Sequence, residues 1–258
     1  MNIVITGGTS GLGKELVEKF ENRGDNVIIL ARSVESGKGI KCDVGNSEEV
    51  KTAFVEIAKT IGKIDFLINN AGYGISGATE LISVEESKRI FDVNFFGTLY
   101  CIQNALPLMK KGSKIINISS ACALFALPFR TLYCASKSAV SMLSNSLRLE
   151  LKTAGIQVCA ICPGEIKTNF TKNRVKHFAT NERYGKRIEN ATNNIDKHED
   201  SRMCVQFVSK KIFKIINKKK LKPQYIIGGK YKALYFASKI FPLSCILGIT
   251  GKTMGGKE

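Results

Sequence analysis

Short apolar runs rich in β-branched residues alternate along the chain with longer stretches whose apolar residues recur at helical spacing. After Asn46, for example, Val50, Phe54, Ile57 and Ile61 fall on one face of a helix. Strands that alternate with amphipathic helices are typical of βαβ units, so the pattern predicts a doubly wound α/β fold with a parallel sheet. The seven predicted strands cover residues 2–6, 26–31, 40–44, 64–70, 113–119, 156–162 and 224–228.

Two segments interrupt this alternation. Residues 33–39 are too few for the helical crossover that joins parallel strands, so we expect a loop there. Residues 168–202 form a long polar stretch, which we interpret as a lid over a binding site. No Pro/Gly-rich linker divides the chain, so we predict a single catalytic domain over residues 1–229 and an amphipathic helical extension over residues 230–258.

The C-terminal extension admits two interpretations. Tyr231, Leu234 and Tyr235 share a helix face and have lysines around them, a pattern suited to peripheral contact with an anionic membrane surface. Alternatively, this aromatic face covers a substrate pocket or a partner subunit. The uncharged residues 240–251 are interrupted by Pro242 and fall short of the roughly 20 apolar residues that span a bilayer, so we expect no transmembrane helix.

Charge is distributed unevenly along the 258 residues, of which 44% are apolar, enough for a sizeable core without disulfides or metal. The 39 Lys and Arg outnumber 22 Asp and Glu, which gives a net charge of +17. Residues 1–150 hold 17 basic and 15 acidic residues, whereas residues 151–258 hold 22 and 7. This asymmetry indicates either an anionic partner, such as nucleic acid, a lipid surface or an acidic carrier protein, or a lysine-rich solvated surface.

Eight cysteines lie in mostly apolar surroundings and lack the dense spacing of a disulfide-rich secreted domain. Cys159 and Cys162 form a C-x-x-C motif, but inside a strand-like run and not at the helix start that activates a thiol. The two histidines are far apart, so we expect no zinc site. The chain opens on a strand and not on a secretory signal, and we predict a cytoplasmic protein with reduced cysteines.

A glycine-rich turn joins the first strand to the first predicted helix. Gly7 is placed for a tight turn, Gly11 for close approach of the backbone to a pyrophosphate, and Gly13 for close packing of the helix on its strand. The phosphates would then meet the helix N-terminus, where unpaired N–H groups and the helix dipole favour anions. Many turns contain glycine for structural reasons alone, but this position favours dinucleotide binding.

The second strand ends in Leu30, Ala31 and Arg32, where a dinucleotide-binding fold presents a residue to the adenosine ribose. An acid there would accept hydrogen bonds from the ribose 2′-hydroxyl, which Ala31 cannot do. Arg32 instead offers a cation to a 2′-phosphate, so the sequence favours NADP over NAD. The alternative is that Arg32 is a solvated strand end.

Ser120 follows the fifth predicted strand, Tyr133 lies thirteen residues later and Lys137 four residues beyond that. Residues i and i+4 share a helix face, so the Lys137 ammonium is expected near the Tyr133 phenol. A nearby cation lowers a phenol pKa that is ordinarily about 10, which would let Tyr133 donate and accept a proton near neutral pH. The Ser120 hydroxyl is expected in the same crevice. A Tyr-x-x-x-Lys pair by itself occurs by chance in many proteins.

Three further motifs follow predicted strands or lie between them: Asn69–Gly72, Asn94 in a Val-Asn-Phe-Phe-Gly run, and Pro163–Gly164. Together with the glycine-rich turn and the serine, tyrosine and lysine above, they occur in the same order as in the short-chain dehydrogenase/reductase family, which the chain resembles. The resemblance covers about residues 1–170 and, more loosely, residues 201–228. It implies a Rossmann-like fold.

The resemblance also implies roles for the site residues. Tyr133 is implied as the catalytic acid/base, Lys137 as the residue that lowers its pKa and binds the nicotinamide ribose, and Ser120 as the group that polarises the substrate carbonyl. Asn94 is implied to help hold a proton-relay water. The residues implied to bind the cofactor are Gly7, Thr9, Ser10, Gly11, Leu12, Gly13, Arg32, Ser33, Asp43, Val44, Asn70, Ala71, Gly72, Tyr133, Lys137, Pro163, Gly164, Ile166 and Thr168.

The activity implied is that of an NADP(H)-dependent oxidoreductase that interconverts a carbonyl and a secondary alcohol without a metal. Because the chain continues past Gly229 into an aromatic helix, a lipophilic substrate (steroid-like, sphingoid-like or long-chain) is favoured over a 3-oxoacyl group on a carrier protein. The resemblance implies a homodimer or homotetramer.

An alternative of another class is a nucleotide-sensing module that binds nucleic acid or another anion through the basic run Lys218–Lys222. The complete serine, tyrosine and lysine set is hard to explain in such a sensor. The basic residues also form no recognisable recognition helix, so nucleic acid is disfavoured.

Overall fold

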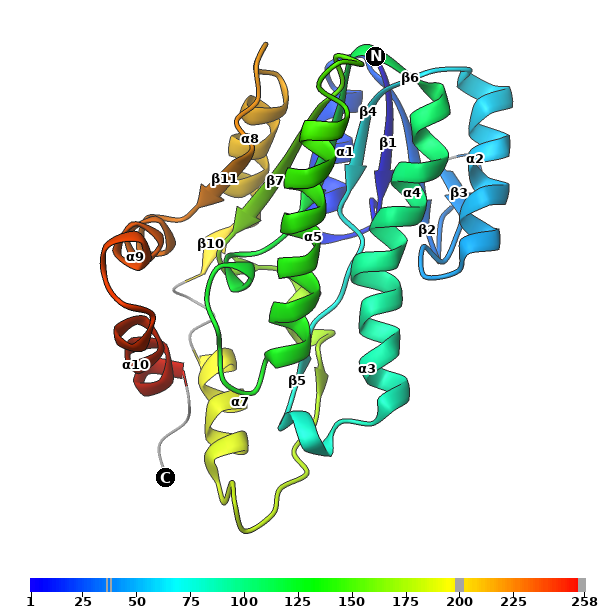
Figure 1. Cartoon of the computed structure of the whole chain (residues 1–258). Helices are drawn as coiled ribbons and strands as arrows, with labels where there is room; N and C mark the ends of the chain where they lie inside the picture. The colour runs from blue at the N-terminus through cyan, green and yellow to red at the C-terminus, as the bar shows by residue number, and fades with distance from the viewer. Residues whose placement is uncertain (36, 38, 198–201, 255–258) are drawn as a thin grey trace.

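The β-branched runs pair into one sheet in the computed structural model, which describes residues 1–35, 37, 39–197 and 202–254 (Figure 1). Its seven strands are β1 (Asn2–Thr6), β2 (Asn26–Ala31), β3 (Gly39–Lys41), β4 (Ile64–Asn69), β6 (Met109–Ile118), β7 (Gln157–Pro163) and β11 (Gln224–Ile227). They lie in the order β11-β7-β6-β4-β1-β2-β3 and every neighbouring pair is parallel. The predicted doubly wound, Rossmann-like α/β fold is confirmed.

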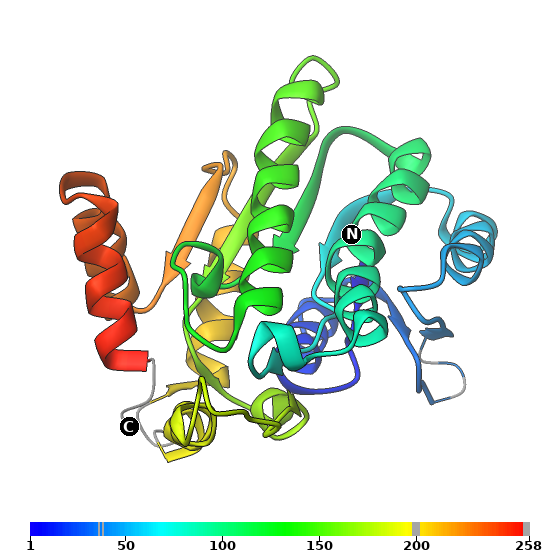
Figure 2. The ribbon, with the colours of Figure 1, turned by 60° about the horizontal axis from the view of Figure 1, so that its bottom comes forward.

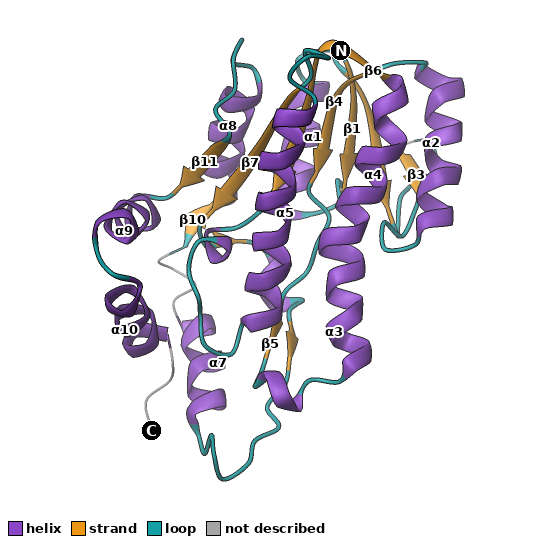
Figure 3. Cartoon of the chain, viewed as in Figure 1, coloured by secondary structure: helices purple, strands orange, loops and turns teal. Residues whose placement is uncertain are grey.

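Helices cover both faces of this sheet (Figure 3). One face is covered by α2 (Ser47–Ile61), α4 (Gly97–Ala105) and α5 (Thr131–Glu150), the other by α1 (Gly11–Glu21) and α8 (Val205–Ile216). Successive strand residues point to opposite faces, so Val4 belongs to the same buried cluster as Phe54 of α2, and Ile5 to the cluster of Phe20 of α1. Burial on both faces explains why the strands are continuous apolar runs.

The strand order reverses between β1 and β4, because the chain continues from β1 to β2 on one side and from β4 to β6 on the other. At such a point the carboxyl ends of the strands leave a crevice where ligands bind. Beside it, α3 (Val84–Phe91), the π-helical turn η2 (Asp92–Phe96) and α4 follow one another without a break. Short 3-10 turns are η1 (Thr79–Leu81), η3 (Leu106–Leu108) and η4 (Ala121–Ala123).

The segment 168–202 is more ordered than the polar loop that we expected. It contains α6 (Asn169–Lys172), β9 (Val175–Lys176) and α7 (Arg187–Lys197), while residues 198–201 lie outside the described residues. Strand β9 pairs with β5 (Ile75–Ser76), and α7 buries Ile188 and Ala191 against Phe129. These partners lie far away in the sequence, so the local polar pattern did not reveal the elements.

Other predicted boundaries need small changes. The third strand ends at Lys41 and not at residue 44, because only three residues pair with β2. In its connection to β2, residues 33–35 and 37 contain no helix, as expected, and residues 36 and 38 lie outside the described part. A second small pair joins β8 (Ile166–Lys167) to β10 (Met203–Cys204).

The C-terminal extension consists of α9 (Gly229–Ile240) and α10 (Leu243–Met254), and residues 255–258 lie outside the described residues. Both helices lie beyond the edge strand β11, to one side of the sheet and its two helical layers (Figure 2). Across the described ranges, no helix combines the length and the apolar character needed to cross a membrane.

Candidate active site

A cavity of about 1000 Å³ opens at the carboxyl ends of the strands, where the strand order reverses. It brings together nearly all of the predicted site residues. Two of them, Gly13 and Asn94, do not line it. Those that do are Gly7, Thr9, Ser10, Gly11, Leu12, Arg32, Ser33, Asp43, Val44, Asn70, Ala71, Gly72, Ser120, Tyr133, Lys137, Pro163, Gly164, Ile166 and Thr168.

The glycine-rich turn is shaped as the sequence predicts. Gly7 has a φ of 66°, which side chains rarely adopt, and a Cβ on Gly13 would lie 2.1 Å from the Gly7 carbonyl oxygen. Gly13 therefore acts through packing of α1 on the turn and not through the cavity. The side chain of Ser10 makes no capping hydrogen bond, so the first N–H groups of α1 remain available to an anion.

Thr6 and Asn70 fasten this turn to the end of β4. The Thr6 hydroxyl accepts hydrogen bonds from the backbone N–H of Asn70 at 3.0 Å and of Ala71 at 2.9 Å. In return, Asn70 Nδ2 donates to the carbonyl oxygens of Thr6 and Gly7 at 3.1 and 3.0 Å. The two strand ends on either side of the crevice are thus held together by polar contacts. The sequence analysis did not identify Thr6.

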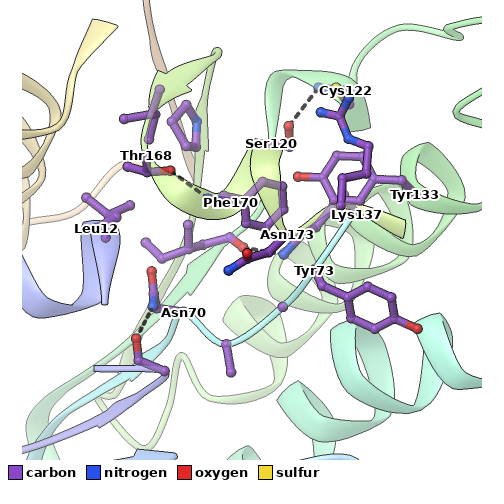
Figure 4. A pocket seen from close by; sticks show the side chains of 18 of the residues that line it. Leu12, Asn70, Tyr73, Ser120, Cys122, Tyr133, Lys137, Thr168, Phe170 and Asn173 are labelled. Atoms are coloured by element: carbon purple, nitrogen blue, oxygen red, sulfur yellow. Dashed lines mark hydrogen bonds between the residues drawn. The ribbon is translucent and has the colours of Figure 1, made fainter. Parts of the chain in front are cut away.

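Ser120, Tyr133 and Lys137 meet on one side of the cavity. Ser120 follows β6, and its hydroxyl accepts a hydrogen bond from the backbone N–H of Cys122 at 3.1 Å. Tyr133 and Lys137 are one turn apart on α5, and Lys137 Nζ donates to the carbonyl oxygen of Ile118 at 3.0 Å. Figure 4 shows the hydroxyl groups of Ser120 and Tyr133 directed to the same part of the cavity.

The pKa of Tyr133 differs from our expectation. Burial raises the pKa of the phenol, while hydrogen bonding to Ser120 and the Arg174 guanidinium act in the opposite direction without cancelling the rise. Burial is the largest contribution and exceeds the effect of any nearby cation, Lys137 included. Its own buried position lowers the pKa of the Lys137 ammonium to about 8. Desolvation thus outweighs the cation that we expected to dominate.

Asn94 lies in the π-helical turn η2 and is fully buried. Its Nδ2 donates to the carbonyl oxygen of Tyr73 at 3.0 Å and to Ser136 Oγ at 3.1 Å, and its Oδ1 accepts from the backbone N–H of Tyr73 at 3.0 Å. The side chain therefore fixes the segment that follows β4 against α5. π-Helical turns are frequent at functional sites, which agrees with this position.

Asp43 and Arg32 mark the other end of the cavity. Arg32 is exposed at the end of β2. Asp43 forms an ion pair with Arg89 and accepts a hydrogen bond from the backbone N–H of Gly45 at 3.0 Å. Partial burial raises the pKa of the Asp43 carboxyl, but these two contacts and Arg32 hold it below its usual range. Its charge therefore shapes the loop after β3.

The family model for short chain dehydrogenase matches residues 1–179, over the elements that carry the turn, Ser120, Tyr133 and Lys137. The chain belongs to the short-chain dehydrogenase/reductase family. It is 35% identical over 255 residues, 93% of both chains, to a probable short-chain type dehydrogenase/reductase, VdlC, of Helicobacter pylori.

Other relatives in the family have named substrates. A 3-ketodihydrosphingosine reductase of Bacteroides thetaiotaomicron is 35% identical over 245 residues, which cover 92% of this chain and 91% of the relative. A 3beta-hydroxysteroid dehydrogenase of Mediterraneibacter gnavus is 32% identical over 186 residues, 66% of this chain and 67% of the relative.

Solved structures of other proteins share the fold. One from Streptomyces avermitilis has a TM-score of 0.82 at 23% identity and covers 97% of this chain and 96% of its own. ElxO with NADP bound has a TM-score of 0.73 at 26% identity and covers 90% of this chain and 98% of its own.

Charged residues that the sequence analysis missed also line the cavity of this short-chain dehydrogenase. Arg130 is buried and forms an ion pair with Glu165 at 3.4 Å. Arg174 Nη1 is buried and has no hydrogen-bond partner in the described part of the chain. Burial and the neighbouring Arg130 lower the pKa of Arg174 to about 10. Arg174 adjoins β9, whose pairing with β5 brings it to the cavity, and no local signal predicts that.

Two residues of the aromatic C-terminal face, Tyr231 and Leu234, line the cavity as well. The Tyr231 hydroxyl accepts a hydrogen bond from the backbone N–H of Glu165 at 3.3 Å. These two residues therefore cover a pocket, as one of the two interpretations of this face expected.

All eight cysteines are free of disulfide bonds, but their surroundings differ. Cys159 and Cys162 are buried in β7, where burial raises the pKa of both thiols, which agrees with the inert role that we predicted. Cys122, by contrast, lines the cavity. Hydrogen bonding to Cys134, with Arg130 nearby, lowers the pKa of Cys122 despite burial. Among the described residues, no cluster of His, Cys, Asp or Glu could hold a metal ion.

Proposed function

We propose that the chain is an NADP(H)-dependent oxidoreductase that interconverts a carbonyl group and a secondary alcohol. The observation that carries this proposal is the convergence of the Ser120 and Tyr133 hydroxyl groups on one part of the cavity, one helical turn from the buried Lys137 (Figure 4). A bound nicotinamide cofactor would supply or accept the hydride. Tyr133 gives its proton to the carbonyl oxygen in reduction and takes one from the alcohol in oxidation.

Ser120 and Lys137 support this proton transfer. The Ser120 hydroxyl donates a hydrogen bond to the substrate oxygen, where negative charge develops. The Lys137 ammonium stabilises the phenolate once the proton has left, and it binds the nicotinamide ribose. Burial lowers the pKa of this ammonium to about 8, so it is mostly charged at pH 7 and loses its proton as the pH rises above 8. Asn94 acts behind them by fixing Tyr73, and we propose that it helps to hold the relay water.

The residues of the turn fit a dinucleotide. Gly7 and Gly11 line the cavity without a side chain, so a pyrophosphate can approach the backbone and the uncapped start of α1. Asp43 and Val44 would line the adenine, and the segment Asn70–Gly72 would lie beside the adenosine ribose. The residues Pro163 to Thr168 would contact the nicotinamide.

NADP is the preferred cofactor in this proposal because of Arg32. Its exposed guanidinium lines the cavity beside Ser33, where it would pair with a 2′-phosphate. Residues 31–34 contain no acid that would hold a 2′-hydroxyl or repel a phosphate. ElxO, a related structure, holds NADP.

A lipophilic carbonyl compound is the substrate class that the cavity favours. Its lining includes Ile75, Phe125, Leu127, Leu234 and Ile249. Relatives at comparable identity are named for a ketosphingoid and for a steroid.

The charged residues near Tyr133 favour some lipophilic carbonyl substrates over others. Arg130 and Arg174 outnumber Glu165, and Arg174 Nη1 has no acceptor among the described residues. An ammonium group beside the substrate carbonyl would meet this excess of positive charge. We therefore favour a neutral or anionic oxo compound, steroid-like or long-chain, over a protonated amino ketone of the sphingoid type.

The segment 168–202 remains our proposed lid. Thr168, Phe170 and Arg174 line the cavity, and the Phe170 ring lies 6.0 Å from the Tyr133 ring between centroids. Closure of this segment would exclude water from the reacting groups.

The test is carbonyl reduction by the purified protein, followed as NADPH oxidation with ketones of graded chain length and charge. We expect the best activity with long-chain or steroid-like ketones. Tyr133→Phe should lower turnover at least about a hundredfold, because it removes the proton donor. NADPH binding, measured by its fluorescence, should remain close to that of the wild type.

Tyr225→Phe is the matched control, because Tyr225 lies on β11 and is not among the residues that line the cavity. Near-normal reduction by Tyr133→Phe would disprove the proposed role of Tyr133. Best activity on small polar ketones would disprove the proposed substrate class.

A further inference from the structure

Large apolar side chains are exposed on α9, on α10 and on the loop between them. Phe236, Ile240, Phe241, Leu243 and Leu247 expose 67, 78, 56, 71 and 44% of their surface. The two helices lie beyond β11, to one side of the rest of the molecule (Figure 2). Five exposed apolar residues within twelve residues of the chain indicate an interaction surface.

The same two helices carry only positive charge. Lys230, Lys232, Lys239 and Lys252 are exposed on them. Residues 201–257 contain no aspartate or glutamate. A second copy placed on this surface would bring lysines of both chains together, whereas an anionic surface would be attracted. The charge therefore favours an anionic partner over self-association.

The inner side of these helices contributes to the cavity. Tyr231 and Leu234 of α9 and Ile249, Thr250 and Thr253 of α10 line it. The exposed apolar residues and the cavity wall thus belong to the same pair of helices. A lipid surface on the outer side would lie next to this wall of the cavity.

We propose that α9, α10 and the loop between them dock on the surface of an anionic lipid bilayer. The five exposed apolar side chains enter the headgroup region and the four lysines face lipid phosphates; these nine residues form the docking surface. Neither helix can span a bilayer, so the contact is interfacial. The inference goes beyond the proposed function, because it does not depend on the reaction catalysed.

The test is co-sedimentation of the full chain with vesicles, either of phosphatidylcholine alone or of equal parts phosphatidylcholine and phosphatidylglycerol. We expect binding to the anionic vesicles, weakened by salt, and little binding to the neutral ones. Replacing Lys230, Lys232 and Lys239 by Gln should weaken anionic binding by about fivefold for each lysine. Phe241→Glu with Leu243→Glu should weaken it by at least about tenfold.

Val55→Glu is the matched control, because Val55 is 51% exposed on α2. This helix follows β3, which is the edge strand at the other end of the sheet from β11. It should bind vesicles like the wild type. Thermal melting and NADPH binding confirm that each variant is folded.

Three outcomes would overturn the proposal. The first is no binding to anionic vesicles at low salt, or equal binding to neutral ones. The second is unchanged binding in both the lysine and the apolar variants. The third is absence of vesicle binding together with a lower mass in solution for Phe241→Glu with Leu243→Glu, which would make this face a contact between copies of the chain.

Discussion

The Tyr133 phenol is subject to opposing effects on its pKa. Burial raises the pKa, and the Arg174 guanidinium is one of the groups that lower it. Arg174→Leu removes that cation, so the pKa of Tyr133 should rise further. Alcohol oxidation needs the phenolate, and its rate should therefore reach its maximum at higher pH than in the wild type.

The measurement is kcat for alcohol oxidation as a function of pH in both proteins. Arg183→Leu serves as the control, because Arg183 is 70% exposed and pairs with Glu80 outside the cavity. If Arg174→Leu and wild type have superimposable pH profiles, Arg174 does not act on Tyr133.

Lys137 should affect how the free energy of unfolding depends on pH. Burial lowers its pKa from 10.5 to about 8 in the folded chain, so between these values the unfolded chain binds more protons. The free energy of unfolding therefore gains a contribution that rises with pH in this window. In Lys137→Met this contribution is absent, so wild type should gain stability relative to the variant as pH rises from 8 towards 10.5.

Urea unfolding of both proteins at several pH values tests this. A difference in unfolding free energy that stays constant across the window would contradict the lowered pKa of Lys137. The same variant should lose carbonyl reduction at least about a hundredfold if its ammonium stabilises the phenolate.

The site residues that the sequence predicts are those with a local signal. Tyr133 and Lys137 share a helix face, so their spacing alone brings them together. Ser120 follows a strand, and the parallel sheet brings the end of that strand to the same crevice. The pKa of Tyr133 was not predictable in this way, because it depends on how far the phenol is removed from water. Arg174 was also missed, because it reaches the cavity through the pairing of β9 with β5, which lies far away in the sequence.

At the level of whole elements, α9 is coupled to the end of β7 through one glycine. A Cβ on Gly164 would lie 1.9 Å from Cε2 of Tyr231. Gly164→Ala should therefore displace the Tyr231 ring, destabilise the fold by about 1–3 kcal/mol and open the cavity wall formed by α9. The expected kinetic result is a higher KM for the carbonyl substrate.

A double-mutant cycle with Tyr231→Ala separates this contact from other effects of the alanine. Unfolding free energies of the four proteins should show that Gly164→Ala is well tolerated once the ring is gone. Additive effects of the two substitutions would show that Tyr231 is not the reason for a glycine at this position.

The elements of the main sheet were predictable because burial on both faces leaves continuous apolar runs. The elements β5, β9 and α7 were not, because β5 and β9 contribute only two paired residues each and the described part of α7 packs on distant residues through Ile188 and Ala191. Their stability comes from partners distant in sequence. Patterns of polarity therefore predicted the scaffold well and the segment over the cavity poorly.

Across the whole molecule, charge is distributed unevenly between two parts of the chain. The half that holds Ser120, Tyr133 and Lys137 is nearly neutral, whereas residues 151–258 carry most of the excess of basic over acidic residues. Tyr231 and Leu234, which looked suited to a membrane, line the cavity, and the opposite side of the same helices is exposed. A sequence pattern shows that a helix has an apolar face, but packing decides which face turns inward.

Cofactor choice can be measured as stability of the whole chain, because a dinucleotide would bridge the two halves of the sheet at the crevice. A ligand at a hundred times its Kd stabilises the folded state by about 2.7 kcal/mol, and each tenfold difference in Kd changes this by about 1.4 kcal/mol. At equal concentrations NADPH should therefore raise the melting temperature more than NADH, because Arg32 would pair with the 2′-phosphate. Arg32→Asp should reverse this order, because it replaces the cation with an acid that repels the phosphate and accepts from a 2′-hydroxyl. Lys41→Asp makes the same change of charge at the end of β3, outside the cavity lining, and should keep the wild-type order. Equal shifts with both cofactors in the wild type, or a reversal by Lys41→Asp as well, would show that Arg32 does not select the cofactor.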